Sequence, residues 1–108
     1  QFFGVQPNPV QHKITIDLAF PSNWTHPQLK GISIGEGELQ TYLDVAFLKG
    51  DAKRKNQLLL IQEGASVWTL RTKIPKGAEV MVGDQIIQPT IDEEGYAEMT
   101  DREVVIRW

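Results

Sequence analysis

The chain has 108 residues, with 11 Lys+Arg against 14 Asp+Glu and a formal charge of −3, and this length suits one domain. Hydrophobic residues make up 41% and charged residues 23% of it, a balance typical of a globular domain rather than a disordered tail. The acidic balance argues against a broadly basic nucleic-acid binder. The lack of cysteine excludes a disulfide scaffold, a thiolate metal site and a cysteine nucleophile.

No run of the chain approaches the roughly 18 apolar residues that span a bilayer, so we expect no membrane insertion. The opening Gln1-Phe2-Phe3-Gly4 lacks the basic segment and long apolar core of an intact signal peptide. Absence of cysteine suits a cytosolic protein, a virion component or a bacterial surface module. We favour an extracellular or virion location over a cytoplasmic one.

Alternation of apolar and polar residues predicts the strands. The clearest case is the segment 12–18, in which one face carries His12, Ile14, Ile16 and Leu18. The same period of two, or a short run rich in branched and aromatic residues, predicts further strands. They cover residues 39–47, 57–62, 66–72, 79–82, 85–90 and 103–108.

Turn-forming residues separate these runs at spacings of about 8–12 residues, which is typical of a sandwich or a small barrel. Gly supplies positive φ and Pro presets φ, so each cluster favours a chain reversal. No window of a dozen residues keeps a helical period, and no internal repeat is found. We therefore predict a single all-β domain over residues 1–108, an antiparallel β-sandwich of about seven to nine short strands, Ig-like or jelly-roll-like.

Such a sandwich needs two inward faces, and the predicted strands carry enough apolar side chains to fill them. At about 1.5–3 kcal/mol for each fully buried side chain, they offset most of the ordering entropy without disulfide or metal. The predicted core is Ile14, Ile16, Leu18, Leu43, Val45, Phe47, Leu59, Ile61, Leu70, Val80, Val82, Ile86, Val104 and Ile106.

Signs of catalysis are weak, and we predict that the protein is not an enzyme and needs no cofactor. The sequence has no nucleophile elbow, phosphate loop or dinucleotide fingerprint. Its two histidines, His12 and His26, fall on different predicted elements, and His12 lies on the apolar face of a strand. Two isolated histidines do not make a zinc site. The acidic run 92–95 lacks the alternating ligands of a calcium loop, so we interpret it as a hairpin turn with Gly95 at positive φ.

The only basic cluster spans residues 49–55 and falls between two predicted strands, so it decorates a loop tip. Its four cations could contact phosphate, an acidic glycan or an acidic partner surface. No aromatic residue is interleaved for base stacking, and the domain is acidic. We predict no nucleic-acid binding and interpret the cluster as a solvated turn that also limits aggregation.

The segment 21–28 is a long polar loop that holds Trp24 between two prolines. An exposed indole stacks on sugar rings or anchors a protein interface, whereas a buried one covers the end of a sandwich. Trp24, His26 and Gln28 are the candidate ligand-binding residues if the loop binds a glycan, with Trp24 supplying affinity and its polar neighbours selecting hydroxyl geometry.

Apolar residues also stand at both ends of the chain. Phe2 and Phe3 lie at one end and Trp108 at the other. Apolar termini tend to be held against their own sheet or against a partner, so these three residues are candidate interface residues. They favour binding to a protein partner or self-association into an oligomer.

The segment Thr90–Ala97 resembles the Thr-x-Asp-x-x-Gly-x-Ala hairpin of bacterial immunoglobulin-like modules. The preceding residues 78–87, with a turn at Gly83-Asp84, fit the strands before that hairpin. Modules of this kind occur in surface adhesins, glycan-active enzymes and phage virion proteins. The resemblance implies a spacer or binding unit without catalysis.

Together these patterns favour a non-catalytic interaction or structural module of a larger assembly, such as a virion or cell-surface protein, that acts through protein–protein contacts. The alternative is a carbohydrate-binding module that uses the loop 21–28.

Overall fold

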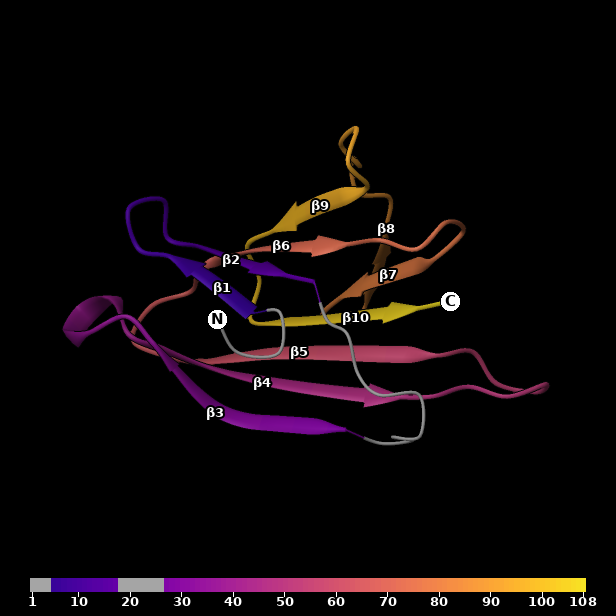
Figure 1. Cartoon of the computed structure of the whole chain (residues 1–108), viewed down its shortest axis with the longest axis horizontal. Helices are drawn as coiled ribbons and strands as arrows, with labels where there is room; N and C mark the ends of the chain where they lie inside the picture. Colours follow the sequence, from indigo (N-terminus) through magenta and orange to yellow (C-terminus); the bar gives the residue numbers. More distant parts are fainter. Residues whose placement is uncertain (1–4, 18–26) are drawn as a thin grey trace.

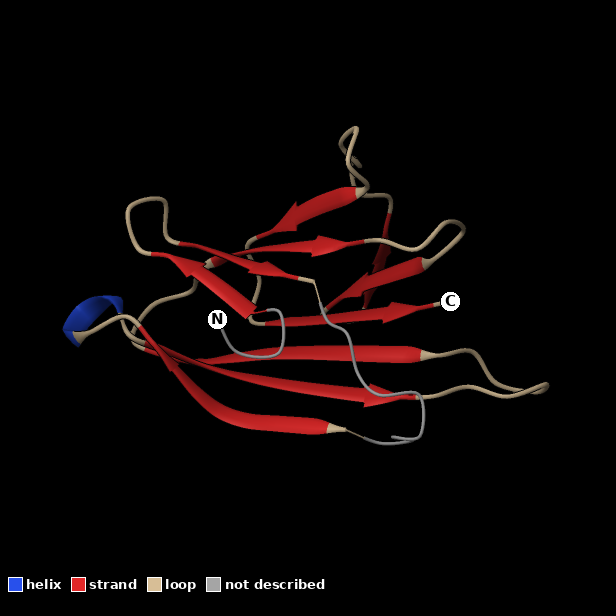
Figure 2. Cartoon of the chain, in the orientation of Figure 1, coloured by secondary structure: helices blue, strands red, loops and turns tan. Residues whose placement is uncertain are grey.

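The computed structural model describes residues 5–17 and 27–108, and these form two β-sheets (Figure 1). One sheet has the strand order β1-β2-β6-β9 and the other the order β3-β4-β5-β10-β7-β8. The first contains β1 (Val5–Asn8), β2 (Lys13–Ile16), β6 (Thr69–Lys73) and β9 (Tyr96–Met99). The second contains β3 (Gln28–Ile34), β4 (Thr41–Leu48), β5 (Gln57–Gly64), β7 (Glu79–Val82), β8 (Gln85–Ile87) and β10 (Glu103–Arg107). A single 3-10 turn, η1 (Gly37–Leu39), is the one helical element among the described residues (Figure 2).

The predicted all-β sandwich is confirmed, with ten strands in the described part of the chain where seven to nine were expected. The strands that sequence reasoning missed include β1 and β3, each of which lies at the edge of its sheet. Pro7 stands inside β1, and Gly31 lies at a register shift between β3 and β4. Both residues weaken the alternation that identifies a strand, and both are tolerated at a sheet edge.

Every strand pair is antiparallel except β2 and β6, which run parallel with Lys13 opposite Thr69 and Ile16 opposite Thr72. These two strands are neighbours in space but not in sequence. The chain leaves β2, builds β3, β4 and β5 in the other sheet, and returns to the first sheet as β6. Because the chain returns through a long crossover connection and not through a hairpin, β6 can run parallel to β2.

The core lies between the two sheets, and most of the predicted core residues are in it. The buried residues that the sequence predicted are Ile14, Ile16, Leu43, Val45, Leu70, Val80, Val104 and Ile106. Phe47 and Val82 are partly buried against the same cluster. Leu18 lies outside the described residues. The largest buried side chain belongs to Trp68, which is 0% exposed and immediately precedes β6.

For β5 and β8 the predicted facing was wrong. Leu58, Leu60 and Gln62 point into the core, whereas Leu59 and Ile61 are only half-buried. Ile86 on β8 is 60% exposed. The run 58–61 is apolar throughout, so it holds no alternation that could distinguish its two faces.

Two positions that the sequence placed in strands lie in turns. His12 has φ 50 and is exposed in the turn between β1 and β2, rather than on the apolar face of a strand. Its ring centroid lies 5.6 Å from that of Trp68. Leu39 closes the 3-10 turn and is 43% exposed, and its carbonyl accepts a hydrogen bond from Trp68 Nε1 at 2.6 Å. The side chain of Trp68 therefore fixes the turn that precedes β4.

The segment 88–95 carries the chain from β8 in one sheet to β9 in the other. Gly95 has φ 89, as expected for the turn. The amide of Gly95 donates to the carbonyl of Asp92 at 3.1 Å, and the amide of Asp92 donates to the carbonyl of Tyr96 at 2.8 Å. Residues 92–96 thus form a local turn in the segment that crosses between the sheets, and not, as the sequence predicted, the tip of a hairpin between two paired strands.

Candidate functional site

Of the three residues predicted for glycan binding, only Gln28 is among the described residues. It is exposed and is the first residue of β3. Trp24 and His26 lie outside the described residues, as do Phe2 and Phe3. The grouping of Gln28 with the loop aromatic therefore stays a prediction.

Trp108, the predicted interface residue at the end of β10, is half-buried and packs against the core cluster. Its ring centroid lies 5.9 Å from that of Phe47 on β4. Its backbone exchanges two hydrogen bonds with Asn56, from Asn56 N to Trp108 O at 2.8 Å and from Trp108 N to Asn56 O at 3.1 Å. The β5–β10 ladder therefore continues one pair beyond the strands and fixes the indole beside the β4–β5 hairpin.

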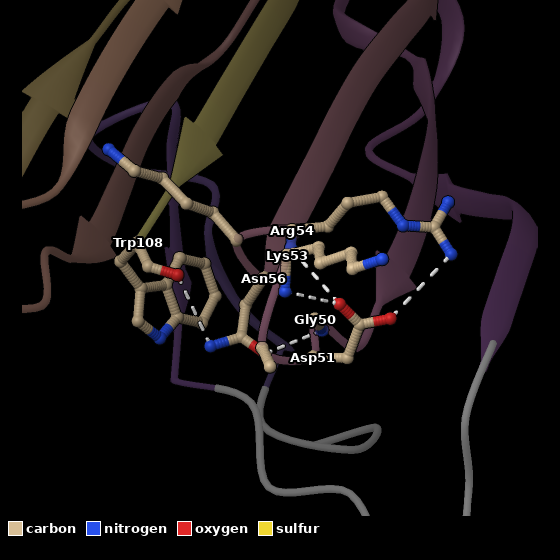
Figure 3. Close-up of a pocket in the computed structure, with 8 residues that line it drawn as sticks. Gly50, Asp51, Lys53, Arg54, Asn56 and Trp108 are labelled. Carbon is tan, nitrogen blue, oxygen red and sulfur yellow. Dashed lines mark hydrogen bonds and ion pairs between the residues drawn. The ribbon is translucent and has the colours of Figure 1, made fainter.

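A shallow hollow of about 540 Å³ opens at this place, lined by the hairpin tip 50–56 and by Trp108. Figure 3 shows Trp108 on one side of the hollow and the Asp51–Arg54 pair on the other, with Asn56 between them. The hollow thus combines a partly exposed aromatic ring with the exposed cations Lys53 and Arg54.

Hydrogen bonds within the tip hold it in one conformation. The carboxylate of Asp51 accepts from the amides of Lys53 and Arg54 at 2.7 and 3.0 Å, and Asn56 Oδ1 accepts from the amide of Gly50 at 2.9 Å. A Cβ on Gly50 would collide with the carbonyl oxygen of Arg54, so only glycine fits there. The bonds from Lys53 and then Arg54 lower the pKa of the Asp51 carboxyl, against a smaller opposing effect of burial.

Sequence reasoning placed the basic cluster on a loop tip correctly but missed its aromatic neighbour. Trp108 lies 52 residues beyond Asn56 in the chain. The antiparallel pairing of β5 with β10, which sets Arg107 opposite Gln57, brings the two together. A contact made by strand pairing leaves no local motif in the sequence.

A second surface of interest is the outer face of the six-stranded sheet. Strand register aligns one row of apolar side chains across five neighbouring strands, from Ala46 through Leu59, Val105 and Met81 to Ile86. We call this row the outer apolar row. Leu59 and Met81 are half-buried and Ile86 is 60% exposed, although this face is turned away from the core. A continuous apolar row on an outward sheet face is typical of a contact surface.

Charged and polar residues border the outer apolar row on both sides. Asp44 and Glu103 lie in the neighbouring row, on either side of Ile61. On the opposite side lies Arg107, whose guanidinium is 3.9 Å from a Glu79 carboxylate oxygen and donates from Nε to Gln57 at 3.1 Å. A small hollow of about 190 Å³ lies at the β3 end of this face, where Gln28, Lys30 and Asp44 meet its apolar residues.

The outer face of the four-stranded sheet is polar and carries a network centred on Arg71. Its guanidinium lies 3.0 Å from Asp92 and 3.7 Å from Glu94, and stacks on the Tyr96 ring with 4.1 Å to the ring centroid. The Tyr96 hydroxyl donates to Asp17 at 3.1 Å. The network ties the crossing segment 88–95 to strands β6 and β9.

The network also shifts the pKa values of two of its members. Backbone donation from Tyr96 lowers the pKa of the Asp92 carboxyl, with further contributions from the amide of Glu94 and the charge of Arg71, while burial opposes the shift. Burial, with the hydrogen bond to Asp17 next, raises the pKa of the Tyr96 phenol. The carboxylate is thus held charged and the phenol neutral, which is the state that keeps each hydrogen bond.

Within residues 5–17 and 27–108, no group of three or more His, Asp or Glu side chains could hold a metal ion. No helix in the same part of the chain is long and apolar enough to span a membrane. A comparison of the chain with protein-family models, with curated proteins and with solved structures found no match.

Proposed function

We propose that this protein is a non-catalytic interaction module of a larger assembly and that it acts through protein–protein contacts. The observation that supports the proposal is the outer apolar row, which crosses five strands of the six-stranded sheet in register. Burying such a row against a partner removes apolar area from water, at about 25 cal/mol for each Å². Partly exposed Leu59, Met81 and Ile86 supply the surface for that contact.

The partner that best fits this face is a second copy of the chain. Glu103 and Arg107 lie on the same face of β10, two residues before and two residues after Val105. A two-fold rotation about the outer apolar row exchanges its two sides, so Glu103 of one copy meets Arg107 of the other, twice per dimer. Isologous contacts of this kind need a surface that complements itself, in charge as well as in shape.

The test is solution mass by size-exclusion chromatography with light scattering over a concentration series. The proposal expects the mass to rise toward two copies as concentration increases. Ile86→Lys and Met81→Lys should shift the protein to one copy, because each sets a charge in the buried row. Gln6→Lys, on the exposed surface of β1, introduces the same charge elsewhere and should leave the dimer intact.

A charge exchange then tests the arrangement. Glu103→Arg should separate the copies by opposing two cations, and the double variant Glu103→Arg/Arg107→Glu should restore the dimer. A wild-type mass of one copy at every concentration would refute self-association, as would a dimer that both lysine variants leave unchanged. The glycan-binding alternative through Trp24 stays a prediction, which Trp24→Ala on a polysaccharide matrix would test.

A further inference from the structure

The hollow between the hairpin tip 50–56 and Trp108 is a separate surface, and nothing in the proposed self-association uses it. It combines three properties that favour the binding of a charged ligand: a fixed backbone, an uncompensated charge and an aromatic side chain. Each property comes from contacts that are independent of the outer apolar row.

The fixed backbone comes first. Asp51 and Asn56 each accept backbone amides of the tip through their side chains, and the Asn56–Trp108 backbone pair anchors the tip to β10. The tip therefore does not have to lose its own conformational freedom when a ligand binds. A preorganised loop binds more tightly than a mobile one that carries the same charges.

The charge of the tip opposes that of the whole chain. Residues 49–55 hold four cations and one carboxylate and so carry a net charge of +3, while the chain has a formal charge of −3. The carboxylate is that of Asp51, whose Oδ1 already accepts two backbone amides. Among the ion pairs of the described residues, only one involves a cation of the tip, the Arg54–Asp51 pair at 4.0 Å. Lys53 and Lys55 therefore leave positive charge for an anionic ligand.

The aromatic side chain of Trp108 indicates which class of anion the hollow can bind. Trp108 is half-buried, packs near Phe47 and lines the hollow from the side. Indole rings bind the C–H faces of sugar rings, while lysine and arginine bind carboxylate or sulfate groups. A hollow of about 540 Å³ exceeds the space that one pyranose ring needs. Stacked nucleic acid fits less well, because it requires several aromatic platforms and a basic domain.

We propose that this hollow binds an acidic saccharide, with its carboxylate or sulfate on Lys53 and Lys55 and a sugar ring against Trp108. Binding by one hollow on the surface is weak and depends on salt, since exposed cations carry much of it. The site adds ligand recognition to a module whose proposed function is protein contact.

Isothermal titration with three acidic probes tests the proposal on the whole chain. The probes are trigalacturonate, a sulfated carrageenan oligosaccharide and sialyllactose. We expect at least one of them to bind, and to weaken tenfold or more in high salt. The methyl-esterified trigalacturonate keeps the ring but loses the charge, and it should bind at least tenfold more weakly than trigalacturonate if that acid is the one bound.

Two variants assign the binding to the hollow. Lys53→Ala/Lys55→Ala should lower the affinity for the bound probe tenfold or more, whereas Lys73→Ala/Lys76→Ala removes two exposed lysines elsewhere and should not. Trp108→Leu keeps an apolar residue against Phe47 and should also lower the affinity. Melting curves of the variants confirm that each is folded.

Several outcomes would overturn the proposal. The first is that none of the acidic probes binds. The second is that both double lysine variants lose affinity for the probe equally. The third is that Trp108→Leu binds the probe as tightly as the wild type. Tighter binding of polyglutamate or of oligothymidylate than of every saccharide would assign the hollow to an acidic peptide or to a nucleic acid instead.

Discussion

The side-chain amide of Gln62 and the backbone of Trp68 bond each other reciprocally across the sandwich. Gln62 Nε2 donates to the carbonyl of Trp68 at 2.8 Å, and the amide of Trp68 donates to Gln62 Oε1 at 2.8 Å. The same Nε2 donates to the carbonyl of Asp101 at 3.1 Å. Gln62 lies on β5 and is 1% exposed, so one buried amide joins the six-stranded sheet to the entry of β6 and to the β9–β10 turn.

Replacing Gln62 with leucine should lower the free energy of unfolding by at least about 3 kcal/mol, because three polar groups lose their partner and each costs about 1–3 kcal/mol when it is buried. The groups left unbonded are the amide and carbonyl of Trp68 and the carbonyl of Asp101. Urea denaturation followed by tryptophan fluorescence measures the change. Gln85→Leu, an exposed position on β8, is the matched control and should change stability by less than about 0.5 kcal/mol.

Gly35 allows Trp68 to reach the turn before β4. It has φ 77, and a Cβ there would lie 2.9 Å from Trp68 Cζ2 and 2.8 Å from the carbonyl oxygen of Leu39. Gly35→Ala should therefore destabilise the fold by about 2–4 kcal/mol, combining backbone strain with overpacking. Gly37 has φ 60 with open space around it, so Gly37→Ala reports strain alone and should cost about 1–2 kcal/mol. Equal melting temperatures for the two variants would contradict the steric account.

The facing of β5 predicts unequal effects at two adjacent leucines. Leu60 is 0% exposed, whereas Leu59 is half-buried on the outer face. Leu60→Ala should cost about 2–5 kcal/mol through lost contacts and a residual cavity, and Leu59→Ala less than about 1.5 kcal/mol. Chemical denaturation of the two variants, which remove the same atoms, decides the point. A larger loss at Leu59 would mean that the strand faces the other way.

Asp92 predicts how stability depends on acid. Its pKa in the folded chain is lower than the ordinary value of 3.8, mainly because Tyr96 and Glu94 donate backbone amides to its carboxylate. A lowered folded-state pKa means that the unfolded chain takes up the proton more readily. The contribution is therefore present above pH 3.8 and is lost as the pH falls through the folded-state value.

Asp92→Asn keeps an oxygen acceptor but removes the charge. At neutral pH the variant should be less stable than the wild type. The difference in stability should shrink as the pH falls below about 4, which is close to the ordinary pKa of an aspartate. Denaturation midpoints between neutral and strongly acidic pH measure this convergence. Glu93→Gln, at an exposed position in the same turn, is the control. A difference that stays constant with pH would contradict the assignment.

Alternation of residue types predicted the strands in which one face is buried and the other is polar. In β2, Ile14 and Ile16 are buried while Lys13 and Thr15 lie on the outer face, and β4 follows the same rule with Leu43 and Val45. The rule failed at β5, where apolar residues occupy both faces, and at the edge strand β3, where a register shift interrupts the period. Both predictions failed for the same reason: the residue pattern of each strand does not indicate which of its faces the other sheet covers.

The features of the candidate sites also fall into two groups, those that the sequence determined and those that only the tertiary structure decided. The basic residues of the tip 49–55 and the turn that carries them follow from composition and from Gly50, so the sequence by itself determined them, together with the all-β class. The contact of that tip with Trp108, the outer apolar row and the Gln62–Trp68 bond were decided only by tertiary structure. Each joins residues through strand register, which depends on pairings between distant segments and on the burial of whole faces rather than on any local pattern.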